Sequence, residues 1–202
     1  MKTIKEIIEQ RGLRKQQALL PDLHPRSKEI VKAYGSRENF LKVFNPDLQR
    51  EVCGDSDVCF FGGAPTLAEL NRTYGRKTAA MWLVPQLYNL SEYCGCRDKL
   101  QGTPLEECAR VIAMEFYYLT VTELMLFFHR FKAGRYGRFY GSVDPLVITT
   151  SLHAFLGERS MEIERHDTQE RLRKEEEERK SNPPISYEEY KRLCMERKMK
   201  GG

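Results

Sequence analysis

The stretch from residue 105 to residue 133 constrains the fold of this chain most. Within residues 105–119 (LEECARVIAMEFYYL), apolar side chains recur at the spacing of one helical face. The residues on this face are Leu105, Cys108, Ala109, Ile112, Ala113 and Phe116. Thr120 and Glu123 then form a capping box for a second helix, VTELMLFFHRFKAG, which is apolar nearly all round. Because a helix without a polar face is buried, we expect this second helix at the centre of the fold.

Helix signals recur along the rest of the chain, whereas strand signals barely occur. Capping boxes at Thr3–Glu6 and Thr66–Glu69 mark two helix starts, and Pro25 suits the first position of another. The predicted helices cover residues 3–12, 25–34, 37–44, 67–74, 77–95, 105–119, 121–133, 145–180 and 187–199. The sequence therefore predicts an all-α fold.

Two segments are less regular. Residues 53–65 (CGDSDVCFFGGAP) are rich in glycine and aspartate, which predicts a loop with a short extended piece at 58–61. Pro85 lies inside the helix predicted over 77–95. Because proline removes a helical hydrogen bond, it predicts either a kink or the start of a new helix there.

The long helix predicted after Asp144 changes character along its length. Its first half (LVITTSLHAFL) is apolar enough to pack, whereas residues 164–180 carry almost no apolar side chain except Leu172. Such a polar helix is usually a solvated face, and its functional alternative is a partner-binding arm. We therefore predict a compact multi-helix core domain at 1–163, from which a charged helical arm at 164–182 extends, and a short C-terminal helix or tail at 183–202.

Composition sets the class of protein. The 202 residues carry a net charge of +4, which permits an acidic partner without demanding one. There is no apolar signal segment at the N-terminus and no apolar run long enough to cross a membrane, so we expect a cytoplasmic protein without membrane contact. In that reducing setting the six cysteines should be free thiols. Their spacing does not suit zinc, and we predict no metal site.

Signatures of catalysis are missing. The sequence has no phosphate-binding P-loop, no HExxH and no GxSxG motif, so we predict neither enzymatic activity nor a cofactor. The histidines are scattered along the chain: His24, His129, His153 and His166. His129 and His153 lie on neighbouring predicted helices, and an active site formed around them is the minor alternative.

The stretch FKAGRYGRFYGSVD (131–144) is the strongest candidate for a binding site. No acid occurs between Glu123 and Asp144, but there are four basic residues, Arg130, Lys132, Arg135 and Arg138. These residues alternate with Tyr136, Phe139 and Tyr140. Arginine and lysine neutralise phosphates, and aromatic rings stack on unpaired bases. We predict DNA contacts, single- or double-stranded, by Arg130, Lys132, Arg135, Tyr136, Arg138 and Tyr140.

The residues of the same stretch can equally be explained by structural roles. Gly134 would end a helix in left-handed conformation, and Gly137 and Gly141 would form turns. Asp144 and Pro145 would open the next helix as its N-cap and first residue. The aromatic rings would then anchor the connection in the core, and the basic residues would keep it soluble. Both readings hold together if the rings point inward and the arginines outward.

A second basic group lies in TLAELNRTYGRKTAAMWL (66–83), which reads as helix, glycine turn, helix. Arg72, Arg76 and Lys77 gather at this turn and form a second candidate contact with nucleic acid. A helix-turn-helix DNA reader would have this outline, but the spacing fits an ordinary αα-hairpin better.

The segment FFHRFKAGRYGRFYGSVDPLVITTSLHAFL resembles uncharacterised proteins of Bacteroidota prophages and conjugative elements, which have a basic GxYGxFYG-like turn before a helix that begins Asp-Pro. The resemblance covers about residues 100–163, and such turns are also similar to those of phage replication accessory and helicase-loader-like proteins. It implies a role in DNA transactions and no catalytic residues. The leading hypothesis is a non-enzymatic nucleic-acid-associated accessory protein of a mobile genetic element, with a role in DNA replication. The alternative is an adaptor that docks a protein partner through its helical surface and the arm at 164–200.

Overall fold

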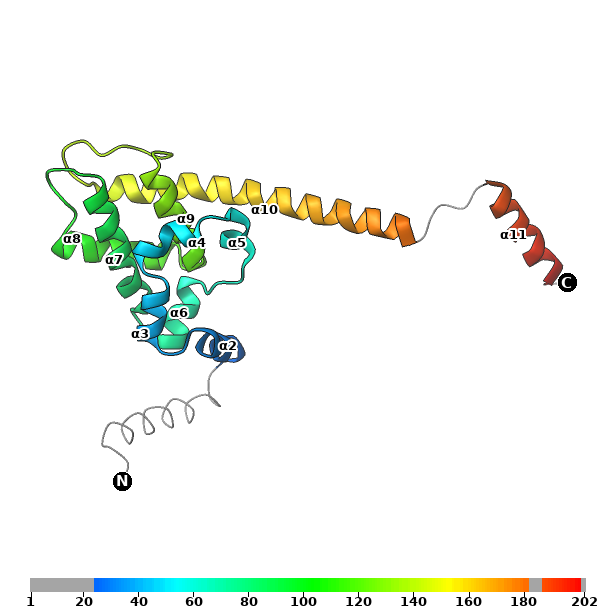
Figure 1. Ribbon diagram of the computed structural model, residues 1–202, viewed down its shortest axis with the longest axis horizontal. Helices are drawn as coiled ribbons and strands as arrows, with labels where there is room; N and C mark the ends of the chain where they lie inside the picture. The colour runs from blue at the N-terminus through cyan, green and yellow to red at the C-terminus, as the bar shows by residue number, and fades with distance from the viewer. Residues whose placement is uncertain (1–23, 182–186, 201–202) are drawn as a thin grey trace, which may run out of the picture. The chain divides into compact units, whose positions relative to one another are not determined.

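The computed structural model describes residues 24–181 and 187–200. The helix predicted at 3–12 lies outside these residues. The elements are α2 (Pro25–Tyr34), α3 (Arg37–Val43), the 3-10 helix η1 (Pro46–Leu48), α4 (Gln49–Val52), α5 (Ser56–Phe61), α6 (Leu67–Tyr74), α7 (Thr78–Tyr93), α8 (Gly102–Glu115), α9 (Val121–Lys132), α10 (Pro145–Ser181) and α11 (Tyr187–Lys200). Isolated bridges replace strands throughout the described part of the chain, so the predicted all-α fold with a long C-terminal helix is confirmed (Figure 1).

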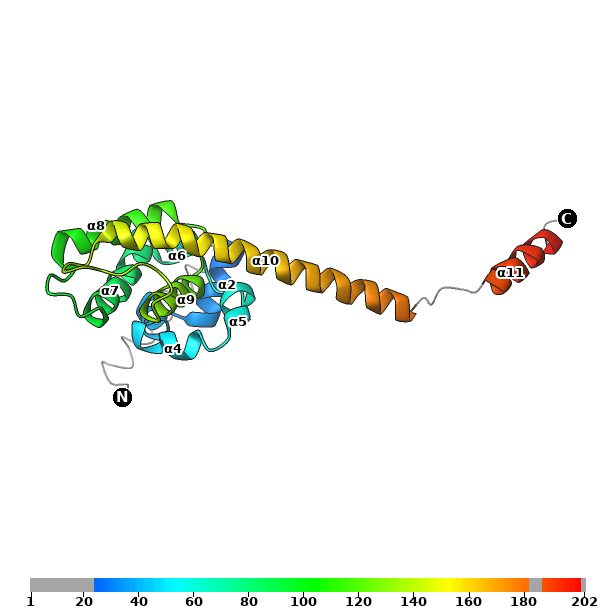
Figure 2. The same ribbon diagram turned by 90° about the horizontal axis from the view of Figure 1, so that it is seen from above.

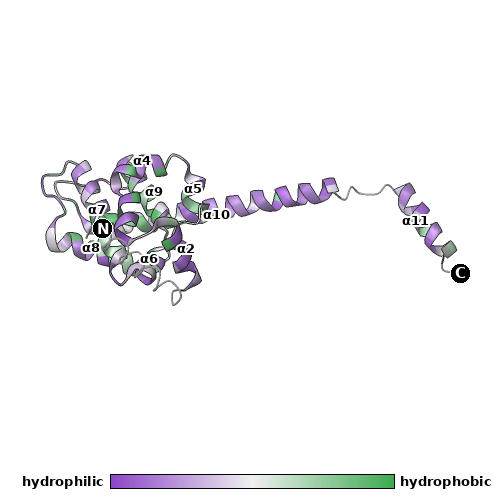
Figure 3. Cartoon of the chain, turned by 60° about the horizontal axis from the view of Figure 1, so that its bottom comes forward, coloured by the Kyte–Doolittle hydropathy of each residue, from purple (hydrophilic) through white to green (hydrophobic). Residues whose placement is uncertain are grey.

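Contacts between residues divide the chain into two compact units, residues 1–156 and 157–202. The boundary falls inside α10, two residues after Phe155, which is the last fully buried side chain of that helix. Figure 3 shows the helices of the first unit with mixed colouring and strongly apolar stretches, and the later part of α10 as almost uniformly hydrophilic.

Helices α7, α8 and α9 supply most of the core of the first unit. Every side chain of α9 from Val121 to Phe128 is buried, so the prediction of a central helix is confirmed. Helix α8 packs along α7, and the face predicted for it is buried from Leu105 to Phe116. Helix α7 contributes Trp82, the largest fully buried side chain. Figure 2, which turns the molecule by 90°, shows α9 surrounded by α4, α5, α7 and the first turns of α10.

The two predicted capping boxes in the described region are present, and they meet in space. Thr66 and Glu69 cap α6 reciprocally, and Thr120 and Glu123 cap α9 in the same way. Between the boxes, the Leu67 N–H donates to the Leu119 carbonyl at 3.0 Å, and the Val121 N–H donates to the Pro65 carbonyl at 3.0 Å. The starts of two helices far apart in sequence are thereby tied together.

One local prediction is wrong, and of the two alternatives given for Pro85 the structure excludes the start of a new helix. Residues 56–61, predicted as loop and extended chain, form the short helix α5, with Asp55 as N-cap accepting from the Asp57 N–H at 2.9 Å. The fully buried Cys59 anchors this helix, a tertiary contact that composition cannot reveal. Helix α7 runs through Pro85 as one element, so no new helix begins there. Pro85 is exposed, which lets its ring avoid the core.

A buried polar chain links four elements beneath the core surface. Gln86 of α7 donates to the Phe44 carbonyl at 2.9 Å, and the Trp82 indole donates to the same oxygen at 2.8 Å. Gln49 of α4 donates to the Gln86 side-chain oxygen at 2.5 Å. The Lys132 ammonium, at the end of α9, completes the chain by donating to the Gln49 side-chain oxygen at 2.7 Å.

The second unit begins at Gly157 and consists of helical residues in its described part. Along α10, ion pairs join side chains three or four residues apart, such as Arg173–Glu170 at 3.1 Å and Lys180–Glu176 at 3.2 Å. Helix α11 forms where the sequence predicts a helix over residues 187–199. Within the described ranges, no helix combines the length and the hydrophobicity needed to cross a bilayer.

Candidate nucleic-acid interface

The segment 130–144, which we call the basic turn, starts with a well-formed helix end. Gly134 has φ +79°, so the predicted left-handed residue is confirmed. Its N–H donates to the Phe131 carbonyl at 2.9 Å, and the Arg135 N–H donates to the Arg130 carbonyl at 3.1 Å. These two bonds form a Schellman motif, which satisfies the last carbonyls of α9 and fixes the direction in which the chain leaves it.

The middle of the basic turn is held by its aromatic rings. The Tyr136 ring lies 5.3 Å from the ring of Phe127, and the Phe139 ring stacks on Phe131 at 5.3 Å. Between them, Gly137 approaches α10 so closely that an added Cβ would lie 3.3 Å from Val147 Cγ1. Two of the three rings therefore point inward, as the structural reading of the sequence predicted, whereas the third, Tyr140, is exposed and that part of the prediction is wrong.

The far end of the basic turn is fixed by a neighbouring loop and by the next helix. The Asp98 N–H donates to the Gly141 carbonyl at 3.1 Å, and the Val143 N–H donates to the Asp98 carbonyl at 2.9 Å. The Asp144 carboxylate then accepts from the Leu146 N–H at 2.8 Å, with Pro145 as first residue of α10. The predicted N-cap is confirmed, and the basic turn is anchored at its start, middle and end.

The outward side of the basic turn carries three prominent side chains. Arg135 and Arg138 are exposed, and Tyr140 is 88% exposed. Because Tyr136 is half-buried against two phenylalanine rings, we remove it from the predicted stacking residues. Of the two tyrosines predicted to stack, Tyr140 remains accessible to a base.

The two basic residues at the end of α9 are engaged inside the protein. The Lys132 ammonium donates to Gln49 and to the Asn89 side-chain oxygen, and burial lowers the pKa of this lysine. The Arg130 guanidinium lies over the Phe60 ring, 5.7 Å from its centroid. Lys132 therefore belongs to the buried polar chain, and we no longer count it among the phosphate contacts.

The second basic group does not join the first. Arg72, in the last turn of α6, and Arg76 and Lys77, just before α7, are exposed, whereas the basic turn lies beside the end of α7. A helix of 16 residues separates the two places by about 24 Å. Thr78 and Ala79 at the start of α7 are buried, so this helix cannot present them to a DNA groove. The segment is an αα-hairpin, in which Asn71 accepts from the Ala79 N–H at 3.0 Å.

The structure adds Arg97 to the candidate interface. Arg97 is exposed in the loop that Asp98 ties to Gly141, and it forms no ion pair with another described residue. Its neighbour Lys99 is instead paired with Glu92 at 2.5 Å. Sequence reasoning missed Arg97 because the pairing of residue 98 with residues 141 and 143 is long-range and leaves no local signal.

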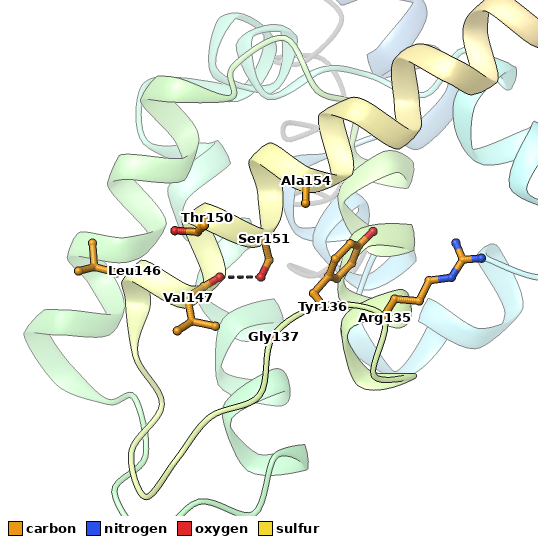
Figure 4. Close-up of a pocket in the computed structure, with 8 residues that line it drawn as sticks. All are labelled: Arg135, Tyr136, Gly137, Leu146, Val147, Thr150, Ser151 and Ala154. Carbon is orange, nitrogen blue, oxygen red and sulfur yellow. Dashed lines mark hydrogen bonds between the residues drawn. The ribbon is translucent and has the colours of Figure 1, made fainter.

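Two hollows flank the basic turn, and Gly137 lines both. The α10-side hollow, of about 470 Å³, is bordered by the first turns of α10 (Figure 4). The α7-side hollow, of about 230 Å³, lies beside the end of α7. The lining of the α10-side hollow is Arg135, Tyr136, Gly137, Leu146, Val147, Thr150, Ser151 and Ala154. The lining of the α7-side hollow is Tyr93, Cys94, Cys96, Phe131, Lys132, Gly134, Gly137, Arg138 and Phe139.

The other groups considered for chemistry are dispersed. In residues 24–181 and 187–200, no three histidine, cysteine or acidic side chains gather so as to hold a metal ion. His153 packs against the Phe116 ring, with ring centroids 5.2 Å apart. Burial raises the pKa of the Cys108 thiol to about 11, which keeps it protonated and inert at neutral pH.

Comparison with known proteins gives one finding. A family of unknown function, DUF6633, matches residues 100–200, a stretch that includes α8, α9, the basic turn, α10 and α11. No curated protein matches the chain, and no solved structure does. The match spans half of the 202 residues, and the chain belongs to the DUF6633 family.

Proposed function

We propose that the protein is a non-enzymatic nucleic-acid-binding protein whose contact surface is the outward side of the basic turn. One observation carries the proposal. Tyr140 is 88% exposed on a backbone segment that is anchored at both ends, and Arg138, two residues away, is exposed as well. Arg135 is a further exposed cation of the basic turn, and Arg97 is exposed in the loop that pairs with residues 141 and 143. The resemblance to prophage and conjugative-element proteins supports a role for this binding in the DNA transactions of a mobile element, including replication.

The chemistry of these side chains suits a phosphate backbone with accessible bases. Arginine presents five N–H donors in a planar fork that matches phosphate oxygens, and an exposed tyrosine offers a face for stacking. The Tyr140 ring lies on a fixed turn and is almost fully exposed, so both of its faces can be reached by a ligand. A nucleic acid uses both groups at once, because the arginines contact its phosphates and the ring stacks on a base.

The test is the affinity of the full chain for labelled oligonucleotides, measured by fluorescence anisotropy over a range of salt concentrations. Each phosphate contact should contribute a slope of about −0.7 to −0.9 in a plot of log affinity against log salt. The double variant Arg135→Glu, Arg138→Glu should lose binding at low salt. The matched control Arg72→Glu, Arg76→Glu reverses two arginine charges at the turn between α6 and α7 and should bind nearly as the unmodified protein does. An unmodified protein without salt-dependent affinity would refute the proposal.

A second candidate function rests on helix α11. Tyr187, Tyr190, Met195 and Met199 are exposed on this helix, and large apolar groups exposed on a helix can dock in grooves of other proteins. The arm at 164–200 would then dock a partner protein. A partner that co-purifies with the full chain should be lost in Tyr190→Glu, Met195→Glu and retained in Arg138→Glu. The reverse pattern excludes docking by the arm.

A further inference from the structure

The α7-side hollow differs from the α10-side hollow in its chemistry. Its wall includes Lys132 and Arg138, and the rings of Tyr93, Phe131 and Phe139. The α10-side hollow is mainly apolar, and Figure 4 shows the Arg135 guanidinium pointing away from Leu146 and Thr150. Cationic and aromatic groups therefore converge on one side of the basic turn, the side that faces the end of α7.

The size of the α7-side hollow limits its occupant. At about 230 Å³ it is smaller than the range of about 300–1,000 Å³ typical of sites for drug-sized molecules. One heterocyclic ring system is the appropriate size, with anything attached to it lying outside. Tyr93 is 63% exposed at the rim, with the Lys132 ammonium 5.8 Å from its ring centroid, and the exposed part of the ring can stack on such an occupant.

Hydrogen-bond donors at this hollow remain for an occupant. A lysine ammonium has three N–H groups, and Lys132 donates two of them, to Gln49 and Asn89. Within the part of the chain that the structure describes, the peptide N–H groups of Gly137 and Arg138 have no protein acceptor. The carbonyl oxygens of nucleobases are acceptors that match these donors, while the exposed Arg138 suits the attached phosphate.

We infer that the α7-side hollow receives one unpaired base of the bound strand, so that the protein selects single-stranded over double-stranded nucleic acid. A base within a duplex is stacked and paired, and it cannot enter a hollow without first leaving the helix. This inference rests on the proposed function. It adds a base pocket formed by Tyr93, Phe139 and Lys132 to the phosphate contacts of Arg138 and Arg97.

The first experiment compares a single strand with the duplex of the same sequence in the anisotropy assay, at one low salt concentration. Tyr93→Leu should weaken binding of the single strand about fivefold or more, which is the loss expected for one stacked base. It should change binding of the duplex little. Tyr88→Leu is the matched control, because Tyr88 is an exposed tyrosine of the same helix that does not line the hollow. Thermal unfolding of both variants checks that the fold is retained.

The second experiment uses the thiols of the hollow. Alkylation by iodoacetamide, followed by mass spectrometry, should become slower at Cys94 and Cys96 when the single strand is bound. Cys194, in α11, is the internal control and should react at the same rate with and without the strand. A mononucleotide phosphate added alone tests whether a free nucleotide occupies the hollow instead.

The outcomes separate the inference from the proposed function. Equal affinity for strand and duplex, or equal binding by Tyr93→Leu and Tyr88→Leu, overturns the inference, even where Arg138→Glu still abolishes binding and so supports the proposed function. Protection of Cys94 and Cys96 by the mononucleotide but not by the strand also overturns it. Loss of all salt-dependent binding in the unmodified protein would overturn both.

Discussion

Replacing Gln86 by leucine tests whether the buried polar chain stabilises the fold. Gln86 is fully buried in α7, where its oxygen accepts from Gln49 and its nitrogen donates to the Phe44 carbonyl. Leucine has a similar volume and can do neither. The change therefore removes two hydrogen bonds from the core and leaves the packing of α7 nearly intact.

The expected loss of unfolding free energy follows from the hydrogen-bonding groups that the substitution leaves without a partner. The Phe44 carbonyl keeps its bond from the Trp82 indole at 2.8 Å, so it loses little. The Gln49 amide, only 3% exposed, is left with an N–H that has no acceptor, which costs about 1–3 kcal/mol. For a unit of this size, that destabilisation lowers the melting temperature by about 2–12 °C.

Urea unfolding followed by circular dichroism measures this loss, and Gln101→Leu is the control, because Gln101 is exposed and its side chain makes no capping bond. In the double variant Gln49→Leu, Gln86→Leu, the total loss should differ from the sum of the single losses by about 0.5 kcal/mol or more, since the two side chains share one bond. If Gln86→Leu unfolds at the same urea concentration as Gln101→Leu, the buried polar chain does not stabilise the protein and our account of Lys132 fails with it.

Two further predictions concern the start of the basic turn. Gly134→Ala places a side chain on a residue with φ +79° and should lower the free energy of unfolding by about 1–2 kcal/mol in the same urea experiment. The control is Gly157→Ala, inside α10, where nothing lies within 4 Å of the new Cβ, and it should be neutral or stabilising. Burial lowers the pKa of Lys132 from 10.5, so the unfolded chain binds more protons than the folded one between the two pKa values, and stability should rise with pH across that window. The Lys132→Met variant should lack this rise in stability. An identical pH dependence of stability in the variant and the unmodified protein would contradict the burial of the Lys132 ammonium.

Local signals in the sequence were sufficient for most of the architecture. The apolar face of 105–116 and the almost wholly apolar stretch 121–128 specify burial through the pattern of apolar side chains alone, and both are buried as predicted. The capping box at Thr120, the left-handed Gly134 and the Asp144 cap each depend on atoms a few residues apart in the chain. Such features are predictable because they depend on the local sequence and not on tertiary contacts.

The wrong predictions and the omissions concern features that depend on tertiary contacts. Helix α5 is too short to be stable alone and depends on burial of Cys59 against the rest of the core. Lys132 looked like a surface cation because its two amide partners lie 83 and 43 residues away in the sequence. The same reason explains why the sequence points to Arg72 and not to Arg97 as a partner of the basic turn. Counting charges along the chain does not show which of these arginines lies near the basic turn in the fold.

The anchoring of the basic turn has a consequence for how it binds. Ordering a loop on binding costs free energy that subtracts from affinity, and a surface fixed beforehand avoids most of that cost. The turn is fixed before any ligand arrives, by the Schellman motif at Gly134, the stacked ring of Phe139 and the backbone pairing of Asp98. Arg138 and Tyr140 lie between these anchors, so only their side chains remain to be ordered. We therefore expect Gly134→Ala, which loosens the first anchor, to weaken oligonucleotide binding while the charges of the interface are unchanged. The same variant would leave binding unaltered if the arginines act simply as a diffuse positive surface.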